Sequence, residues 1–287
     1  MSASQGESNA GGPVIGVFDS GFGGLTVLRA LVSRLPHASY SFIGDTARLP
    51  YGSKSRRTIA RYAVESAQFL VREQKAEFLV IACNTASALA LDAIQAAVPV
   101  PVLGVIEPGA AAAKAVSGRG DVLVIATDAT VHSHAYAAAC NSLGLRALEK
   151  ACPLLVPLVE EGWTEHPVTD QVIRIYLEEL LQEAAAKGMR PDALVLGCTH
   201  YPLLRPLIER AVPAGMRVID SADSTADAAV QTINHRAGAH RGGHSGSDDA
   251  TTAIRCFATD SVEKFERLGS RFLGRPVGQV ELVDLGG

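Results

Sequence analysis

Short apolar segments alternate with longer segments of mixed polarity along most of this chain. The apolar segments have the length of buried strands and occur at residues 14–18, 39–43, 77–82, 100–106, 121–126, 193–197, 217–219 and 254–257. Because these segments are apolar on both faces, they predict parallel strands that are covered by helices on either side.

The longer segments between these strands repeat with a helical period. We expect helices at residues 25–34, 55–74, 86–97 and 170–187. In the second of these, Ile59, Tyr62, Ala63 and Leu70 recur at the spacing of the buried face of an amphipathic helix. Strands that alternate with helices predict an α/β fold, in which ligands bind beyond the carboxyl ends of the strands.

The two halves of the chain resemble each other. Residues 77–83 and 192–198 both contain an acidic residue, an apolar strand, a small residue and a cysteine, and residues 14–19 and 122–127 show a weaker likeness. The two cysteines are 198 − 83 = 115 residues apart, which is the length of a domain. We therefore expect two pseudo-symmetric Rossmann-like (flavodoxin-like) domains with parallel sheets and an active site in the cleft between them.

The expected first domain comprises residues 13–106 together with 219–287, and the second comprises residues 107–218. Residues 1–12 are small and polar, which predicts a disordered tail. Residues 235–250 are rich in Gly, His, Ser and Asp without an apolar period, which predicts a flexible loop within the first domain.

Three histidines in the expected loop raise the question of a metal site. They are His235, His240 and His244, and their spacing matches no recognised ligand motif. Since loop histidines are usually solvated, we expect no metal at this position.

The composition is that of an ordinary globular protein. The 287 residues are 47% hydrophobic, and 26 Lys and Arg against 30 Asp and Glu give a formal charge of −4. A mildly acidic chain lacks the basic surface of a non-specific nucleic-acid binder, and no apolar run reaches membrane-spanning length. Because no secretory signal is visible, we expect a cytoplasmic protein whose five cysteines are reduced.

Two of the five cysteines occupy positions that favour reactivity. Cys83 and Cys198 each follow a buried strand and precede an expected helix, where backbone N–H groups and the helix dipole favour a thiolate. Cys140, Cys152 and Cys256 are interpreted as packing residues. For Cys83 and Cys198, a role in core packing remains the alternative to a functional role.

Two thiols on opposite sides of a cleft suit the inversion of a carbon centre. One removes a proton from the carbon and the other returns a proton to the opposite face. The reference pKa of a thiol, about 8.5, is close enough to neutrality for both forms to be reached. Asp19, at the end of the first strand, and His200 are placed to exchange protons with the thiols or to orient them. Each is alternatively only a cap at the end of a strand.

Small polar residues at the strand ends form a potential cradle for a carboxylate. Together with their immediate neighbours, they are Asp19, Ser20, Gly21, Pro50, Tyr51, Gly52, Asn84, Thr85, Thr199 and His200. The glycine-rich residues 20–24 match neither a P-loop nor a dinucleotide-binding motif. Taken alone, they indicate a tight turn between a strand and a helix.

Four motifs in a fixed order connect the chain to a known family. They are IGVFDSGFGG at residues 15–24, GDTARLPYG at 44–52, ACNTAS at 82–87 and LGCTHYP at 196–202. With these motifs the chain, from about Val14 to its end, resembles the glutamate racemases of the aspartate/glutamate racemase superfamily.

The resemblance implies an enzyme without cofactors or metals that interconverts L- and D-glutamate and supplies D-glutamate for peptidoglycan. Cys83 would take the α-proton from D-glutamate with the help of Asp19, and Cys198 would take it from L-glutamate with the help of His200. The residues that the resemblance assigns to substrate binding are Asp19, Ser20, Pro50, Tyr51, Gly52, Asn84, Thr85, Thr127, Thr130, Thr199 and His200.

An acidic residue near the second cysteine is also implied by the resemblance. Glu160 is the preferred match, and its neighbour Glu161 leaves the assignment open. Carbanion chemistry without a cofactor relies on preorganised donors and on exclusion of water. We therefore expect the domains to close over glutamate, with hinges near residues 106–108 and 218–221.

Several alternatives remain at this point. Aspartate or hydantoin racemases, or a decarboxylase that keeps one cysteine, lie within the same superfamily. The presence of both cysteines argues against the decarboxylase, and Thr199 with His200 favours glutamate by family likeness. A two-domain binding protein without activity is the alternative from another class. Family members commonly form dimers and some bind a topoisomerase, so a homodimer is expected, while the sequence is silent on the topoisomerase.

Overall fold

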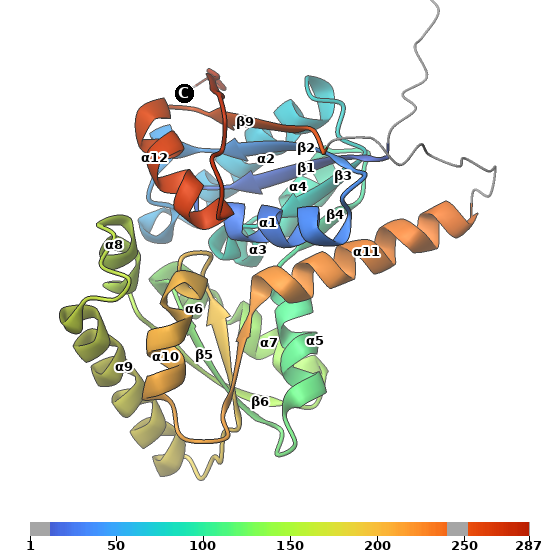
Figure 1. Cartoon of the computed structure of the whole chain (residues 1–287). Helices are drawn as coiled ribbons and strands as arrows, with labels where there is room; N and C mark the ends of the chain where they lie inside the picture. Colours follow the sequence, from blue (N-terminus) through green and yellow to red (C-terminus); the bar gives the residue numbers. More distant parts are fainter. Residues whose placement is uncertain (1–11, 240–251, 287) are drawn as a thin grey trace, which may run out of the picture.

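Two parallel sheets organise the computed structural model, which describes residues 12–239 and 252–286 (Figure 1). The larger sheet has the strand order β10-β9-β2-β1-β3-β4, and the smaller has the order β6-β5-β7-β8. The strands of the larger sheet are β1 (Val14–Asp19), β2 (Ser39–Gly44), β3 (Phe78–Ile81), β4 (Val102–Gly104), β9 (Ile254–Ala258) and β10 (Val280–Leu282). Those of the smaller sheet are β5 (Asp121–Ala126), β6 (Arg146–Ala151), β7 (Ala193–Gly197) and β8 (Arg217–Asp220).

Helices connect the strands and cover the sheets (Figure 1). The α-helices are α1 (Leu25–Arg34), α2 (Arg56–Arg72), α3 (Asn84–Leu89), α4 (Leu91–Ala97), α5 (Ile106–Val116), α6 (Asp128–Ser133), α7 (Ala135–Ser142), α8 (Leu155–Glu160), α9 (Pro167–Ala186), α10 (Arg205–Ala211), α11 (Ser221–Ala239) and α12 (Val262–Leu273). Short 3-10 turns are η1 (Thr46–Arg48), η2 (Tyr51–Ser53) and η3 (Tyr201–Leu204). None of the helices described here is both long and apolar enough to cross a membrane.

The central strand β1 shows why the apolar segments become buried strands. Successive side chains of a strand point to opposite faces of the sheet. Ile15 and Val17 therefore join the core that contains residues of α1 and α12, whereas Phe18 joins the core formed with α2 and α4. Burial on both faces explains the continuous apolar pattern.

The expectation of two pseudo-symmetric α/β domains is confirmed by the strand order. The order β2-β1-β3-β4 in one sheet corresponds to β6-β5-β7-β8 in the other. Cys83 follows β3 and Cys198 follows β7, so the two cysteines occupy equivalent places. The larger sheet is extended at one edge by β9 and β10, which come from the C-terminal part of the chain (Figure 1).

The chain passes between the sheets twice. It leaves the larger sheet after β4, and α5 then packs against β7 and β8. It returns through α11, which packs against α1 and α5. The second crossing lies later than the predicted boundary at residue 219, because Ile219 and Asp220 still pair with Val195 and Leu196 in the smaller sheet.

Several local predictions differ from the structure. The strand expected at 100–106 is confined to β4, since Pro101 precedes it and Ile106 begins α5. The helix expected at 86–97 is divided at Ala90, whose backbone angles (φ −133°, ψ −2°) are not helical. The strands β6 and β10 were not predicted.

The flexible loop expected at 235–250 also needs correction at its start. Helix α11 extends to Ala239, so His235 is part of a helix, where it is exposed. His240 and His244 lie outside the described residues, as does the tail expected at 1–12 except for Gly12. Within the described ranges, no group of three or more His, Cys, Asp or Glu side chains is arranged to hold a metal ion.

Candidate active site

A cavity of about 570 Å³ lies where the carboxyl ends of strands from both sheets meet. Ser20 and Cys83 reach it from the end of β1 and β3, and Thr127 and Cys198 reach it from the end of β5 and β7. Of the residues predicted for the site, only Asp19 and Thr130 do not line it. Both are buried behind residues that do.

Cys83 is held at the start of α3. Its sulfur accepts a hydrogen bond from the Ala86 N–H at 3.4 Å, and its thiol donates to Ser20 Oγ at 3.3 Å. Burial and the nearby Asp19 carboxyl raise the pKa of Cys83 to about 12, against the lowering effect of the two hydrogen bonds. The thiol form of Cys83 is therefore favoured at neutral pH.

Asp19 supports this thiol from behind. The carboxyl is 1% exposed, and its Oδ2 accepts the Gly21 N–H at 2.9 Å. Its Oδ1 has no hydrogen-bond partner among the described residues. Burial raises the pKa of Asp19, while the charge of His200 and the surrounding backbone N–H groups oppose that rise. A carboxylate of raised pKa is a better proton acceptor than an ordinary aspartate.

Cys198 has a different neighbour, the imidazole of His200. The sulfur lies 4.0 Å from His200 Nδ1, and His200 Nε2 lies 3.4 Å from Glu160 Oε1. The second contact has the distance of an ion pair but lacks the alignment of a hydrogen bond. On the other side of the carboxylate, Lys264 Nζ lies 3.1 Å from Glu160 Oε2. Cys198, His200, Glu160 and Lys264 thus form a series of contacts.

The charge of this series is set by competing effects. Burial alone would lower the pKa of His200, but contact with Cys198 and Glu160 raises it to about 10. Burial likewise opposes ionisation of Glu160, yet contact with His200 and Lys264 brings its pKa below the ordinary value. The imidazolium and the carboxylate therefore stabilise each other beside Cys198.

The choice between Glu160 and Glu161 can now be examined by position. Glu160 lines the cavity, whereas Glu161 does not and instead lines a neighbouring apolar pocket together with Trp163. The position of Glu160 beside His200 agrees with the preferred match.

Hydrogen-bond donors and hydroxyls occupy a further part of the cavity wall, which also contains apolar residues such as Leu49 and Val156. The Asn84 Oδ1 accepts the Tyr136 hydroxyl at 2.7 Å, which leaves its buried Nδ2 without a partner among the described residues. The hydroxyls of Thr85, Thr127 and Thr130 are mutually within 2.9–3.4 Å. An amide donor and rotatable hydroxyls suit the binding of a carboxylate.

The segment containing Pro50 and Gly52 is fixed by Tyr51. The buried Tyr51 hydroxyl donates to the carboxylate of Asp45, which also receives the Arg48 Nε at 2.8 Å. This network holds the η2 turn against the end of β2.

Sequence reasoning did not identify several residues of the site. Lys264 comes from α12, 240 positions after the end of the first motif at residue 24, and an exposed lysine on an amphipathic helix gives no local signal. Phe22 and Phe272 pack against the His200 ring, with centroid distances of 6.0 and 5.0 Å. Tyr136 lies in α7, whose sequence contains no recognised motif.

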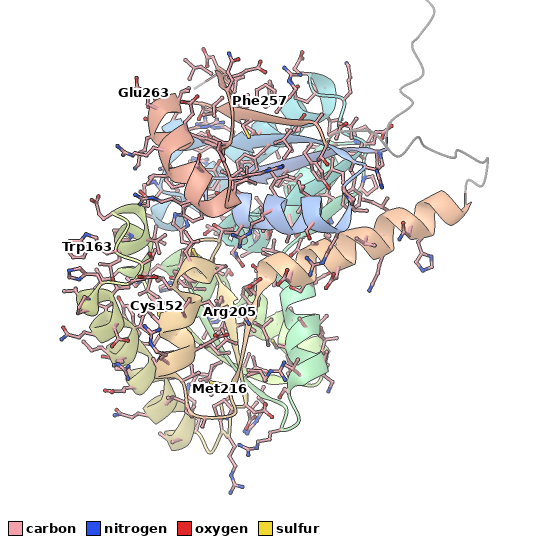
Figure 2. All side chains as sticks on the ribbon, in the orientation of Figure 1. Cys152, Trp163, Arg205, Met216, Phe257 and Glu263 are labelled. Carbon is pink, nitrogen blue, oxygen red and sulfur yellow. The ribbon has the colours of Figure 1, made fainter. Side chains whose placement is uncertain are left out.

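The three remaining cysteines behave as packing residues. Cys140, Cys152 and Cys256 are free, buried and absent from the cavity wall. Cys152 directly follows β6, and Figure 2 labels it in the smaller domain.

Comparisons with known proteins point to one family. Residues 15–229 match the family model described as Asp/Glu/Hydantoin racemase. A glutamate racemase from Koribacter versatilis is 55% identical over 290 residues, which cover 96% of this chain and 98% of the relative.

Solved structures agree with the sequence comparisons. A glutamate racemase isoform from Bacillus anthracis has a TM-score of 0.85 at 37% identity, covering 95% of this chain and 98% of its own. The enzyme from Francisella tularensis, solved in complex with D-glutamate, has a TM-score of 0.83 at 33% identity with the same coverage.

Proposed function

The chain belongs to the Asp/Glu/Hydantoin racemase family, and on that premise we propose that it interconverts L- and D-glutamate by proton transfer at two cysteines. The observation that carries the proposal is that Cys83 and Cys198 line one cavity from equivalent strands of the two domains. A carbon centre between two thiols can lose a proton on one face and gain one on the other.

The two thiols have separate roles in the proposed mechanism. Cys198 removes the α-proton of L-glutamate while Cys83 donates a proton to the opposite face, and the roles are reversed for D-glutamate. Asp19 exchanges a proton with Cys83, and His200 orients Cys198 and balances its charge. The substrate ammonium, when bound near Cys83, lowers the pKa of that thiol by electrostatic attraction.

Substrate binding is assigned to the polar wall of the cavity. The Asn84 Nδ2, which has no partner among the described residues, and the hydroxyls of Thr85 and Thr127 support carboxylate binding, because each offers a hydrogen-bond donor at a site shielded from water. The proposal of glutamate is supported by the Francisella tularensis relative, which was solved with D-glutamate. The product would serve peptidoglycan synthesis in the cytoplasm.

Isotope incorporation and cysteine substitution test the mechanism together. The wild type in deuterated water should convert L-glutamate to D-glutamate that carries deuterium at the α-carbon. Cys83→Ala and Cys198→Ala should each lower kcat by roughly 10³-fold or more, because each removes a proton donor and acceptor. Cys140→Ala is the matched control, and its racemisation rate should stay within about twofold of the wild type once folded protein is quantified. Near wild-type turnover in either active-site variant would refute the two-thiol mechanism.

The substrate alternatives are separated by the same assay. Circular dichroism should show loss of optical activity with L-glutamate and little change with L-aspartate or a hydantoin. A higher kcat/KM for aspartate would overturn the glutamate assignment while leaving the two-thiol chemistry intact. The decarboxylase alternative is disfavoured because both cysteines line the cavity.

A further inference from the structure

The two oxygens of the Glu160 carboxylate are divided between two cations. Oε1 faces His200 Nε2 at 3.4 Å, and Oε2 faces Lys264 Nζ at 3.1 Å. A carboxylate held by one partner can rotate about its terminal torsion, which has a broad energy minimum. A second partner on the other oxygen restricts that rotation.

Lys264 reaches Glu160 from the other domain. Glu160 is the last residue of α8 in the smaller domain, and Lys264 lies in the first turn of α12 in the larger. In Figure 1, α8 and α12 occupy the same side of the molecule, and Figure 2 labels Glu263, the residue before Lys264. The contact therefore depends on how the two domains are placed.

We propose that Lys264 is a positioning residue, which holds Glu160 against His200 across the domain boundary and so assists proton transfer at Cys198. This inference rests on the proposed two-thiol racemisation of glutamate. Lys264 does not bind the substrate in this role; it acts through Glu160 and His200.

The surroundings of Lys264 support a fixed position for its ammonium group. Its Nζ lies 5.7 Å from the centre of the Phe22 ring, and that ring also packs against His200. The stem of a lysine commonly lies along apolar surface while the ammonium reaches a polar partner. Within the described part of the chain, Lys264 is the only lysine or arginine that lines the cavity.

The distance between Lys264 and Glu160 therefore depends on how the two domains are placed. If the cleft opens, Lys264 and Glu160 separate because they belong to different domains. The Glu160 carboxylate is only 22% exposed in the present arrangement, so its charge is screened less than that of a surface pair. The Cys198 side of the cavity is consequently completed when the domains are close together.

Isotope effects can test this role on one side of the reaction. The two enantiomers have equal free energy, so kcat/KM is the same in both directions for any variant. A defect that affects only the step at Cys198 therefore cannot be recognised by comparing kcat/KM for L- and D-glutamate. A slower step at Cys198 instead raises the isotope effect with L-[2-²H]glutamate, whose deuterium that thiol removes. It lowers the effect with D-[2-²H]glutamate, because proton removal by Cys83 then limits the rate less.

Lys264→Met is the informative variant. We expect kcat to fall by about two- to fivefold, the size associated with a partly exposed ion pair, with opposite changes in the two isotope effects. Lys264→Arg should restore both isotope effects towards wild type. Arg267→Met removes an exposed cation one turn along the same helix and should leave them unchanged.

A double variant separates positioning from other roles. In Glu160→Gln, adding Lys264→Met should change the isotope effects no further, because the group through which Lys264 acts is already altered. A rise in KM for both enantiomers with unchanged isotope effects would show direct substrate binding and overturn the inference. If instead the wild type failed to racemise glutamate, the proposed function itself would fall.

Discussion

The two thiols occupy equivalent positions but have unequal surroundings. Cys83 contacts a serine hydroxyl and lies near the buried carboxyl of Asp19, whereas Cys198 lies beside the imidazole of His200. The two domains therefore share the same backbone arrangement around the cysteines, whereas the charged group beside the sulfur differs between them. In the proposed mechanism each thiol therefore works with its own neighbouring group, Asp19 for Cys83 and His200 for Cys198.

The charge of His200 has a consequence for stability. Because its pKa is raised from 6.5 to about 10, folding favours the protonated imidazole. The resulting stabilisation is complete below about pH 6.5 and is lost as pH rises through about 10. His200→Asn should therefore lower Tm most at pH 6 and progressively less towards pH 10.

Thermal unfolding across this pH range measures the effect. A difference of a few degrees at pH 6 is expected, since 1 kcal/mol shifts Tm by roughly 2–4 °C in a protein of this size. His235→Asn, at an exposed position on α11, is the matched control and should show no pH-dependent difference. A Tm difference for His200→Asn that grows with pH would contradict the assigned charge.

Most residues of the candidate site could be predicted because they directly follow strands. Cys83 and Cys198 are recognisable from position, and the family motifs add the threonines around them. Lys264 and Phe272 could not be found in this way, because the contact of Lys264 with Glu160 and that of Phe272 with His200 both depend on the packing of α12. Contacts that cross a domain boundary leave no periodic signal in the sequence.

At the scale of elements, the turn between β1 and α1 is shaped by close contact with the other domain. A Cβ atom at Gly23 would lie 2.3 Å from Thr199 Oγ1 and 2.7 Å from His200 Nδ1. The glycine-rich residues 20–24, which taken alone indicate a tight turn, therefore also allow Thr199 and His200 of the second cysteine motif to lie close to that turn. No side chain fits at Gly23 without displacing Thr199 or His200.

Gly23→Ala should lower activity more than stability. The added methyl group moves Thr199 and His200 away from their present positions, and we expect kcat/KM to fall by about tenfold or more. Steady-state racemisation and thermal unfolding of the same preparation measure the two effects. Gly118→Ala is the control, since its nearest contact would be 3.6 Å from Asp192 Oδ2 and should be tolerated. Unchanged kcat/KM in Gly23→Ala would show that the turn can relax.

The elements that differ from the sequence-based predictions have identifiable physical causes. In β6 only Leu148 is buried, so this edge strand lacks a continuous apolar pattern. The break between α3 and α4 at Ala90 occurs at a residue with high helix propensity, where tertiary packing outweighs local preference. Central strands and long amphipathic helices, by contrast, could be predicted because burial imposes a regular pattern on them.

At the scale of the whole molecule, the two chain crossings determine how the domains can move. The first lies between β4 and α5, close to the hinge expected at 106–108. The second lies at the junction of β8 and α11, at the end of the hinge expected at 218–221. Two connections near the same boundary permit a rotation that opens or closes the cavity.

Closure on glutamate should be visible in solution. Small-angle X-ray scattering should show a smaller radius of gyration when saturating glutamate is added, because the domains approach each other and exclude water from the cavity. Cys83→Ala is useful here, since it prevents turnover during measurement. L-lysine, which has an unsuitable side-chain charge, should produce no change. An identical radius of gyration with and without glutamate would contradict closure.

The position of β9, α12 and β10 after the whole smaller sheet in the sequence affects the order in which the two domains are made on the ribosome. Strands β5 to β8 are contiguous in sequence, so the smaller sheet can assemble while later residues are still being made. The larger sheet gains β9 and β10 only after all strands of the smaller sheet have been made, and Lys264 and Phe272 are made between these two strands. A nascent chain therefore contains both cysteines well before the wall around His200 is finished, which delays a complete active centre until α12 has been made.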